Sequence, residues 1–138
     1  MKLAKRAAAV GLAALPLLLP ACASNPTPPA PAARSRPSPK VGTTAVGVAS
    51  WYGPGYDGKR TACGDRFDQD ALTAAHGSWG CDTRVRVTLL STHKSVIVRI
   101  NDLLPGAKGR LIDLSRGAAR EIGLIGPGTG RVTLEVVK

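Results

Sequence analysis

The segment TACGDRF, residues 61–67, places a cysteine and an aspartate two positions apart, on either side of a glycine. Cys63 could form a disulfide with Cys81, act as a nucleophile, or join Cys81 and His76 in binding a metal ion. The spacing of these three residues matches no familiar zinc pattern, and a nucleophilic Cys63 would leave Cys81 unpaired. Asp65 either stabilises the turn that the glycine marks or serves as a working carboxylate.

The start of the 138-residue chain indicates the compartment in which these side chains work. Residues 1–21 have the features of a secretory signal, because the basic start MKLAKR precedes an apolar run too short to span a bilayer comfortably. The following LPAC, residues 19–22, resembles the bacterial lipoprotein box, so we expect Cys22 to carry a lipid anchor. An ordinary signal peptide with an incidental cysteine is the alternative. Ala23 is not the Asp that favours inner-membrane retention, so in a Gram-negative cell we expect the outer membrane, facing the periplasm.

With Cys22 lipidated, Cys63 and Cys81 remain as an even pair in an exported domain, which favours a disulfide. The bridge would close a loop of about 19 residues and stabilise the fold by roughly 3 kcal/mol in the chain-entropy account. This is a useful supplement for a small domain in a chain with one Phe and two Trp.

Composition separates a tether from a folded domain. Residues 22–45 contain six prolines and few large apolar side chains, so we expect an extended, disordered and semi-rigid tether. Residues 46–138 form a single domain with 13 Lys and Arg against nine Asp and Glu, a net charge of +4. Export argues against nucleic acid as a partner, and a mildly positive domain favours an anionic polymer such as cell-wall glycan.

The domain should consist mainly of short strands. Period-two alternation predicts four strands, and two further short segments could add to them: residues 45–52, 84–90, 95–101 and 131–137, then 71–75 and 111–114. In the first strand Val46 and Val48 should form the apolar face. Ser115 can cap a helix at residues 116–122, and Gly123 can end it. A closed barrel is favoured because closure removes exposed strand edges.

Five segments resemble, in order and spacing, the rare lipoprotein A (RlpA) family of bacterial cell-wall proteins: GVASWYG (47–53), KRTACGDRFD (59–68), LTAAH (72–76), VIVRIND (96–102) and GRLIDLSRGAAREIG (109–123). The resemblance covers residues 46–138 and implies a mostly β fold, a six-stranded double-psi β-barrel with one or two short helices. Characterised members are lytic transglycosylases that cleave peptidoglycan glycan strands and prefer strands without stem peptides. Many members add a C-terminal peptidoglycan-binding domain; because the chain ends at Lys138, we expect no such domain and no septal targeting by it.

The resemblance also implies roles for three side chains. Glycan cleavage needs a proton donor at the glycosidic oxygen and an acceptor for the attacking hydroxyl. Asp65 would be the acid and then the base, at a position that is usually Glu in the family motif ANGE. Asp102, in RIND, would polarise Asp65 or stabilise positive charge on the sugar, and His76, in LTAAH, would bind substrate or orient a carboxylate. The structural alternatives are that Asp65 only stabilises a turn, that Asp102 caps the next loop, and that His76 is a buried structural histidine.

Two departures from the family pattern affect this site. Asp is one methylene shorter than Glu, which retracts the carboxyl group by about 1.5 Å, and we expect the Cys63–Cys81 bridge to reposition the loop in compensation. Leu103 and Leu104 stand where the family commonly has Arg-Gly, which removes a cation beside the aspartate of RIND. The other expected substrate contacts are Trp51, Tyr52, Asn101 and Asp113. Trp51 and Tyr52 could stack on a sugar ring, and packing in the core is the alternative role for these two aromatic side chains.

These observations favour an endolytic lytic transglycosylase that needs no metal and no organic cofactor. We expect a monomer that reaches peptidoglycan from a membrane anchor at Cys22. The alternative is a non-catalytic module that binds or loosens the wall, as expansins are understood to act, with the same groove and no cleavage. A purely structural envelope lipoprotein is a third interpretation.

Overall fold

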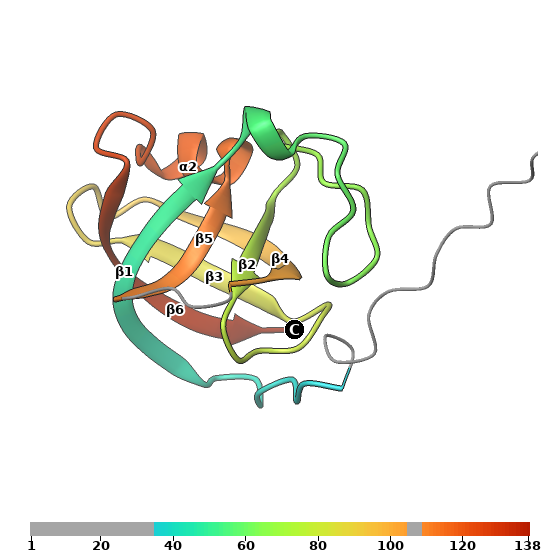
Figure 1. Ribbon diagram of the computed structural model, residues 1–138. Helices are drawn as coiled ribbons and strands as arrows, with labels where there is room; N and C mark the ends of the chain where they lie inside the picture. Colours follow the sequence, from blue (N-terminus) through green and yellow to red (C-terminus); the bar gives the residue numbers. More distant parts are fainter. Residues whose placement is uncertain (1–34, 105–108) are drawn as a thin grey trace, which may run out of the picture.

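The computed structural model describes residues 35–104 and 109–138, and these residues form a closed six-stranded β-barrel with one short α-helix (Figure 1). Around the barrel the strands lie in the order β1-β5-β2-β4-β3-β6. Their bounds are Thr44–Tyr52 (β1), Thr73–His76 (β2), Arg84–Leu89 (β3), Ser95–Leu103 (β4), Arg110–Ser115 (β5) and Thr129–Val137 (β6). The mostly β barrel predicted from the sequence is confirmed.

Two strand pairs are parallel, β1 with β5 and β2 with β4, and the other four are antiparallel. Each parallel pair contains a register shift at which one residue has no partner, Leu111 in β5 and Asn101 in β4. A bulge of this kind changes which side chains of a strand share a face. The two shifts therefore decide which residues reach the outer surface of β5, β2 and β4.

The barrel interior is filled by branched apolar side chains, which include Val85, Val87, Val98, Ile100, Ile112, Leu114 and Leu134. The apolar face predicted for β1 is wrong at Val46, which is 58% exposed, whereas Ala49 is fully buried. The reason is space, because a Cβ at Gly47 would lie 2.8 Å from the Cβ of Leu111. Small residues of β1 face the interior, and Val46 faces solvent.

The helix α2, Arg116–Ile122, has the predicted bounds. The Ser115 hydroxyl accepts a hydrogen bond from the Ala118 N–H at 3.2 Å, and Gly123 ends the helix with a left-handed φ of 82°. The same hydroxyl donates to the Ala71 carbonyl oxygen, which ties the start of the helix to the segment before β2. Within the described residues no helix is long and apolar enough to cross a membrane.

The end of the expected tether lies against the barrel, and β1 begins at Thr44, two residues before the predicted start of the domain. The Gly80 N–H donates to the Pro37 carbonyl oxygen at 3.1 Å, and the Gly42 N–H donates to the Val136 carbonyl oxygen at 2.8 Å. These bonds, and one from the Val136 N–H to the Thr43 carbonyl oxygen at 2.8 Å, give parts of this segment backbone partners on the barrel despite its prolines. The rest of the expected tether, the signal segment and Cys22 lie outside the described residues.

Candidate active site

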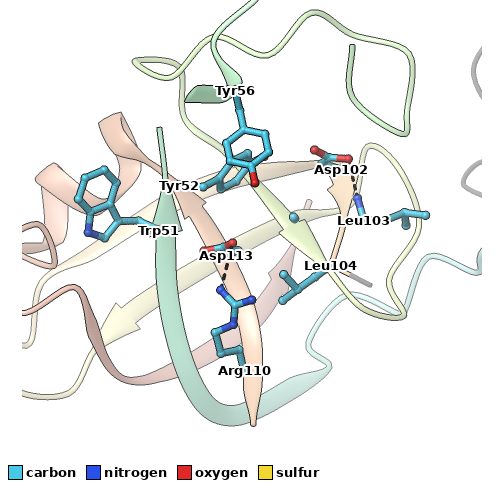
Figure 2. A pocket seen from close by; sticks show the side chains of 9 residues that line it. Trp51, Tyr52, Tyr56, Asp102, Leu103, Leu104, Arg110 and Asp113 are labelled. Carbon is cyan, nitrogen blue, oxygen red and sulfur yellow. Dashed lines mark hydrogen bonds and ion pairs between the residues drawn. The ribbon is translucent and has the colours of Figure 1, made fainter. Parts of the chain in front are cut away.

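A cavity of about 480 Å³ opens on the outer face of the barrel, over β5, β2 and β4 (Figure 2). Its floor follows a row of register partners, because Asp113 lies between Ser50 and Ala75, and Ala75 in turn pairs with Asp102. The small side chain of Ala75 leaves the space between the two aspartates open. The described lining consists of Trp51, Tyr52, Tyr56, Ala75, Asp102, Leu103, Leu104, Arg110 and Asp113.

The two register shifts create this row. Without the shift in β4, Asn101 would pair with Ala75 in place of Asp102. Without the shift in β5, Ser50 would pair with Ile112 in place of Asp113. Since neighbouring strands lie about 4.8 Å apart, the Cα atoms of the two aspartates are separated by about 10 Å across the middle strand.

Asp113 is the buried carboxyl group of the pair, at 8% exposure. The Ser50 hydroxyl donates to its Oδ1 at 2.7 Å, and the Arg110 guanidinium lies 3.5 Å from its Oδ2. Burial raises the pKa of Asp113 above its usual range, the hydrogen bond from Ser50 and the charge of Arg110 oppose this rise, and the negative charge of Asp102 adds to it. The net rise favours the protonated form, which a general acid requires.

Asp102 is in a different environment. It is partly exposed, and its Oδ1 accepts hydrogen bonds from the backbone N–H groups of Ala62 and Leu103, both at 2.9 Å. Two donors on one oxygen suit a charged carboxylate and fix its orientation. Two carboxyl groups in contrasting environments are the arrangement that divides acid and charge-stabilising roles in glycan cleavage.

Tyr52, the last residue of β1, lines the same cavity as Asp102 and Asp113. Its ring stacks on Phe67 with centroids 4.4 Å apart and makes a T-shaped contact with Tyr56 at a centroid distance of 5.7 Å. Burial, and then the charges of Asp102 and Asp113, raise the pKa of Tyr52, so its hydroxyl remains a donor. That hydroxyl is buried, and a hydrogen bond with the Asp102 side chain contributes to the rise in its pKa.

Of the other aromatic side chains, Trp51 belongs to the lining, but its ring points away from the two carboxyl groups and packs against the core (Figure 2). Tyr56, in the 3-10 turn Pro54–Tyr56, lines the cavity and is 56% exposed, with the Lys59 ammonium 5.2 Å from the centroid of its ring. Sequence reasoning missed Tyr56, Ser50 and Arg110. Ser50 carried no signal, because its partner Asp113 lies 63 positions away; Arg110, three residues before Asp113, could have been found from its spacing.

His76 is not brought into the cavity. It pairs in register with the core residue Ile112, and it is 3% exposed. Its Nδ1 accepts from the N–H groups of Ser78 and Trp79, and its ring stacks on Trp79 with centroids 4.2 Å apart. Asn101, expected to contact substrate, is likewise buried at 2% exposure and is the unpaired residue of the β4 shift.

The pH dependence of stability should report the burial of His76. Burial, and then the charge of Arg36, lower its pKa from 6.5 to about 4. The unfolded chain binds a proton below pH about 6.5 and the folded chain does not, so the free energy of unfolding should fall by up to about 3 kcal/mol between pH 6.5 and 4. Chemical denaturation of His76→Asn, which keeps an acceptor near Nδ1, should show a smaller loss. His93→Asn, in the exposed turn between β3 and β4, should lose as much stability at low pH as the wild type. If His76→Asn also lost as much, the buried His76 would not be the cause of the pH dependence.

Asp65 lies beside a second cavity, of about 340 Å³, lined by Cys63, Asp65, Cys81 and Asp82. Its Oδ2 pairs with the Arg99 guanidinium at 2.5 Å, and the same guanidinium reaches Asp82 at 3.1 Å. Cys63 and Cys81 form a disulfide with an S–S distance of 1.97 Å. The structure thus places Asp65 next to the bridge and outside the lining that Asp102 and Asp113 share. Among the described residues no group of three or more His, Cys, Asp or Glu could hold a metal ion.

Comparison with known families now bears on this site. A family model described as "Lytic transglycolase" matches residues 44–134, which include Asp102, Asp113 and the rest of the cavity floor. The chain belongs to this family.

Similarity to curated proteins supports the same family membership. The chain is similar to the probable endolytic peptidoglycan transglycosylase RlpA of a Synechocystis strain, with 58% identity over 92 residues, 67% of this chain and 29% of that protein. It is 50% identical over 97 residues to the endolytic peptidoglycan transglycosylase RlpA of Campylobacter jejuni, covering 70% of this chain and 35% of that protein. The chain therefore spans about a third of the length of these curated relatives.

Solved structures with little sequence identity share the fold. The Streptomyces papain inhibitor superposes with a TM-score of 0.60 at 21% identity, covering 71% of this chain and 97% of the inhibitor. An expansin of Clavibacter michiganensis superposes with a TM-score of 0.58 at 24% identity, covering 70% of this chain and 51% of the expansin. At these identities the likeness concerns the barrel alone.

Proposed function

We propose that this chain is an endolytic peptidoglycan lytic transglycosylase whose acid is Asp113 and whose charge-stabilising carboxylate is Asp102. The observation that carries the proposal is the pairing of a buried carboxyl of raised pKa with a hydrogen-bonded carboxylate across Ala75, in one open cavity. Membership of the lytic transglycolase family and the names of the relatives support the reaction class and the peptidoglycan substrate.

The proposed reaction uses no water. Asp113 protonates the glycosidic oxygen, and the bond from that oxygen to C1 of the muramoyl sugar breaks. Asp102 stabilises the positive charge that develops at C1 and the ring oxygen. The 6-hydroxyl of the same sugar then attacks C1 and gives its proton to the Asp113 carboxylate, which closes the 1,6-anhydro ring and restores the acid. In this proposal Tyr52 and Tyr56, which both line the cavity, contact the sugar.

The expectation that Asp65 is the acid remains a prediction alongside this proposal. In its favour stands the motif position; against it stand the Arg99 ion pair and the placement of Asp65 in the second cavity. Substitution of each aspartate separately by Asn decides between the two assignments, as argued in the Discussion.

The test of the proposed function is a digest of purified peptidoglycan. The full chain with its disulfide intact is incubated with amidase-treated and untreated sacculi, and 1,6-anhydro-muramic ends are counted by mass spectrometry. New anhydro ends that increase with time and enzyme concentration support the transglycosylase. Reducing ends in their place would indicate hydrolysis, and the absence of both ends would overturn the proposal.

One observation favours a second candidate, a non-catalytic module that binds or loosens glycan. The expansin of Clavibacter michiganensis, whose barrel resembles this one, has been solved with cellohexaose. In this second reading the cavity between Asp102 and Asp113 holds a glycan strand without cleaving it. Co-sedimentation of the chain with sacculi that acquire no anhydro ends would select this candidate.

We further infer a location at the cell envelope, held by a lipid on Cys22 with the chain facing the periplasm. The lipoprotein-box residues support the anchor, and the wall substrate of the relatives supports the compartment. Cys22→Ala should move the protein from the membrane fraction to the soluble fraction in cell lysates probed by immunoblot. Cys22→Ala protein that sediments with membranes as the wild type does would contradict the anchor.

A further inference from the structure

The residues between Lys59 and Phe67 form a compact loop beside the end of β4, called here the 59–67 loop. Arg60 and Arg66 form an antiparallel bridge, and the Phe67 N–H donates to the Lys59 carbonyl oxygen at 2.7 Å. At its tip the Thr61 N–H donates to the Asp65 carbonyl oxygen at 2.8 Å. The Phe67 end of the loop stacks on Tyr52 of β1, whereas the tip, residues 61–65, can shift if its attachments to the barrel weaken.

In the part of the chain that the structure describes, four attachments hold the tip of this loop to the barrel. The disulfide joins Cys63 to Cys81, and the Cys63 N–H donates to the carbonyl oxygen of Asn101 at 3.2 Å. Asp65 pairs with Arg99, which also holds Asp82 in the segment that carries Cys81. The fourth attachment is the hydrogen bond from the backbone N–H of Ala62 to the Asp102 carboxylate. Among the described residues, this last bond is the one that connects the loop directly to a proposed catalytic carboxylate.

We propose that the Cys63–Cys81 disulfide and the Arg99–Asp65 ion pair are positioning elements that hold the Ala62 N–H against Asp102. Cys63 is the chain neighbour of Ala62, so fixing one fixes the backbone of the other within a single residue. Asp65, two residues further on, closes the far side of the same tip through Arg99. Asp65 thereby acts on the reaction through the backbone donor and not as a group that touches the sugar. The catalytic part of this inference rests on the proposed function.

The proposal predicts a kinetic effect distinct from loss of folding. If the loop tip moves away by about 1 Å, Asp102 loses one of its two N–H donors and its fixed orientation, and kcat should fall by about ten- to a hundredfold. Movement confined to the tip leaves Lys59 and Phe67 at the two ends of the loop, where Lys59 lies over the Tyr56 ring and Phe67 stacks on Tyr52. The cavity lining is then little changed, so KM should change by less than about threefold.

The experiment compares four full-length proteins: the wild type, the double variant Cys63→Ala/Cys81→Ala, Arg99→Gln and Arg86→Gln. Arg86 makes a similarly exposed ion pair, with Glu135 at 2.7 Å on β6, and it serves as the matched control. The first measurement is NMR hydrogen exchange, which needs no activity. The Ala62 amide should exchange at least about tenfold faster in the double variant and in Arg99→Gln, whereas the amides of β3 keep their protection. Arg86→Gln should match the wild type throughout.

The second measurement is kcat and KM for anhydro-end formation. The double variant and Arg99→Gln should lose kcat with little change in KM, and wild type reduced and then reoxidised should recover its kcat. Unchanged Ala62 exchange in both variants overturns the proposal, and so does unchanged kcat in both. If the double variant fails to fold, Arg99→Gln, which keeps the disulfide, decides alone. If the wild type does not cleave peptidoglycan, the proposed function is wrong. Hydrogen exchange would still decide whether the disulfide and Arg99 hold the Ala62 N–H in place.

Discussion

Replacing Asp113 by Asn should lower the rate of anhydro-end formation by about 10²–10⁴-fold, the usual contribution of a positioned acid. Asn keeps the shape of the side chain and an acceptor for the Ser50 hydroxyl, which lies 2.7 Å from Oδ1, but it has no proton to give the glycosidic oxygen. The measurement is the count of anhydro ends released from sacculi under initial-rate conditions. Asp70→Asn, which alters an exposed ion pair with Arg116, is the control and should keep full activity.

Stability and pH separate this catalytic role from a structural one. The pKa of Asp113 is raised in the fold, mainly by burial, so its ionised form destabilises the folded state above that pKa. Asp113→Asn removes this penalty, and its melting temperature should equal or exceed that of the wild type at neutral pH. The wild-type rate should decline as the pH rises through the pKa of Asp113, because the acid loses its proton. An Asn variant that melts earlier and keeps more than a third of the activity would refute the role.

Asp113 also shows what sequence reasoning could reach. Its place just before a capped helix made it a candidate for either a structural role or substrate contact. Its raised pKa could not be predicted, because the causes come from elsewhere in the chain. The Ser50 hydroxyl comes from β1, the Asp102 charge from β4, and both are brought level with Asp113 by register shifts in the parallel strand pairs. Alternation predicts the strands, but the position of a bulge depends on pairing across the barrel.

Packing across strands, which the sequence alone does not reveal, also explains why His76 and Val46 differ from their predicted places. His76 belongs to a motif with catalytic associations, yet in β2 it pairs with Ile112, on the face opposite to that of its neighbour Ala75. Val46 follows the apolar alternation of its strand but faces solvent, because the bulged Leu111 fills the space beside Gly47. Spacing along the chain identified these positions, and packing across strands decided where their side chains lie.

Replacing Asp102 by Asn should lower the rate by about 10²–10³-fold, because a neutral amide cannot stabilise the positive charge that develops on the sugar. Asn retains an acceptor for the N–H groups of Ala62 and Leu103, so the 59–67 loop should stay in place and hydrogen exchange of Ala62 should match the wild type. Combining Asp102→Asn with Asp113→Asn should cost far less than the product of the single effects, since the two groups serve one transition state.

Asp65→Asn provides the decisive contrast with these two variants. Its carboxylate holds Arg99 outside the groove, so its loss should act only by loosening the loop and should cost about tenfold, less than either groove aspartate. If instead Asp65→Asn abolishes cleavage while Asp113→Asn retains it, the motif position outweighs the observed geometry. Asp65 would then have to leave Arg99 and enter the groove when glycan binds. The ordering of three initial rates, measured on one batch of sacculi, therefore assigns the acid.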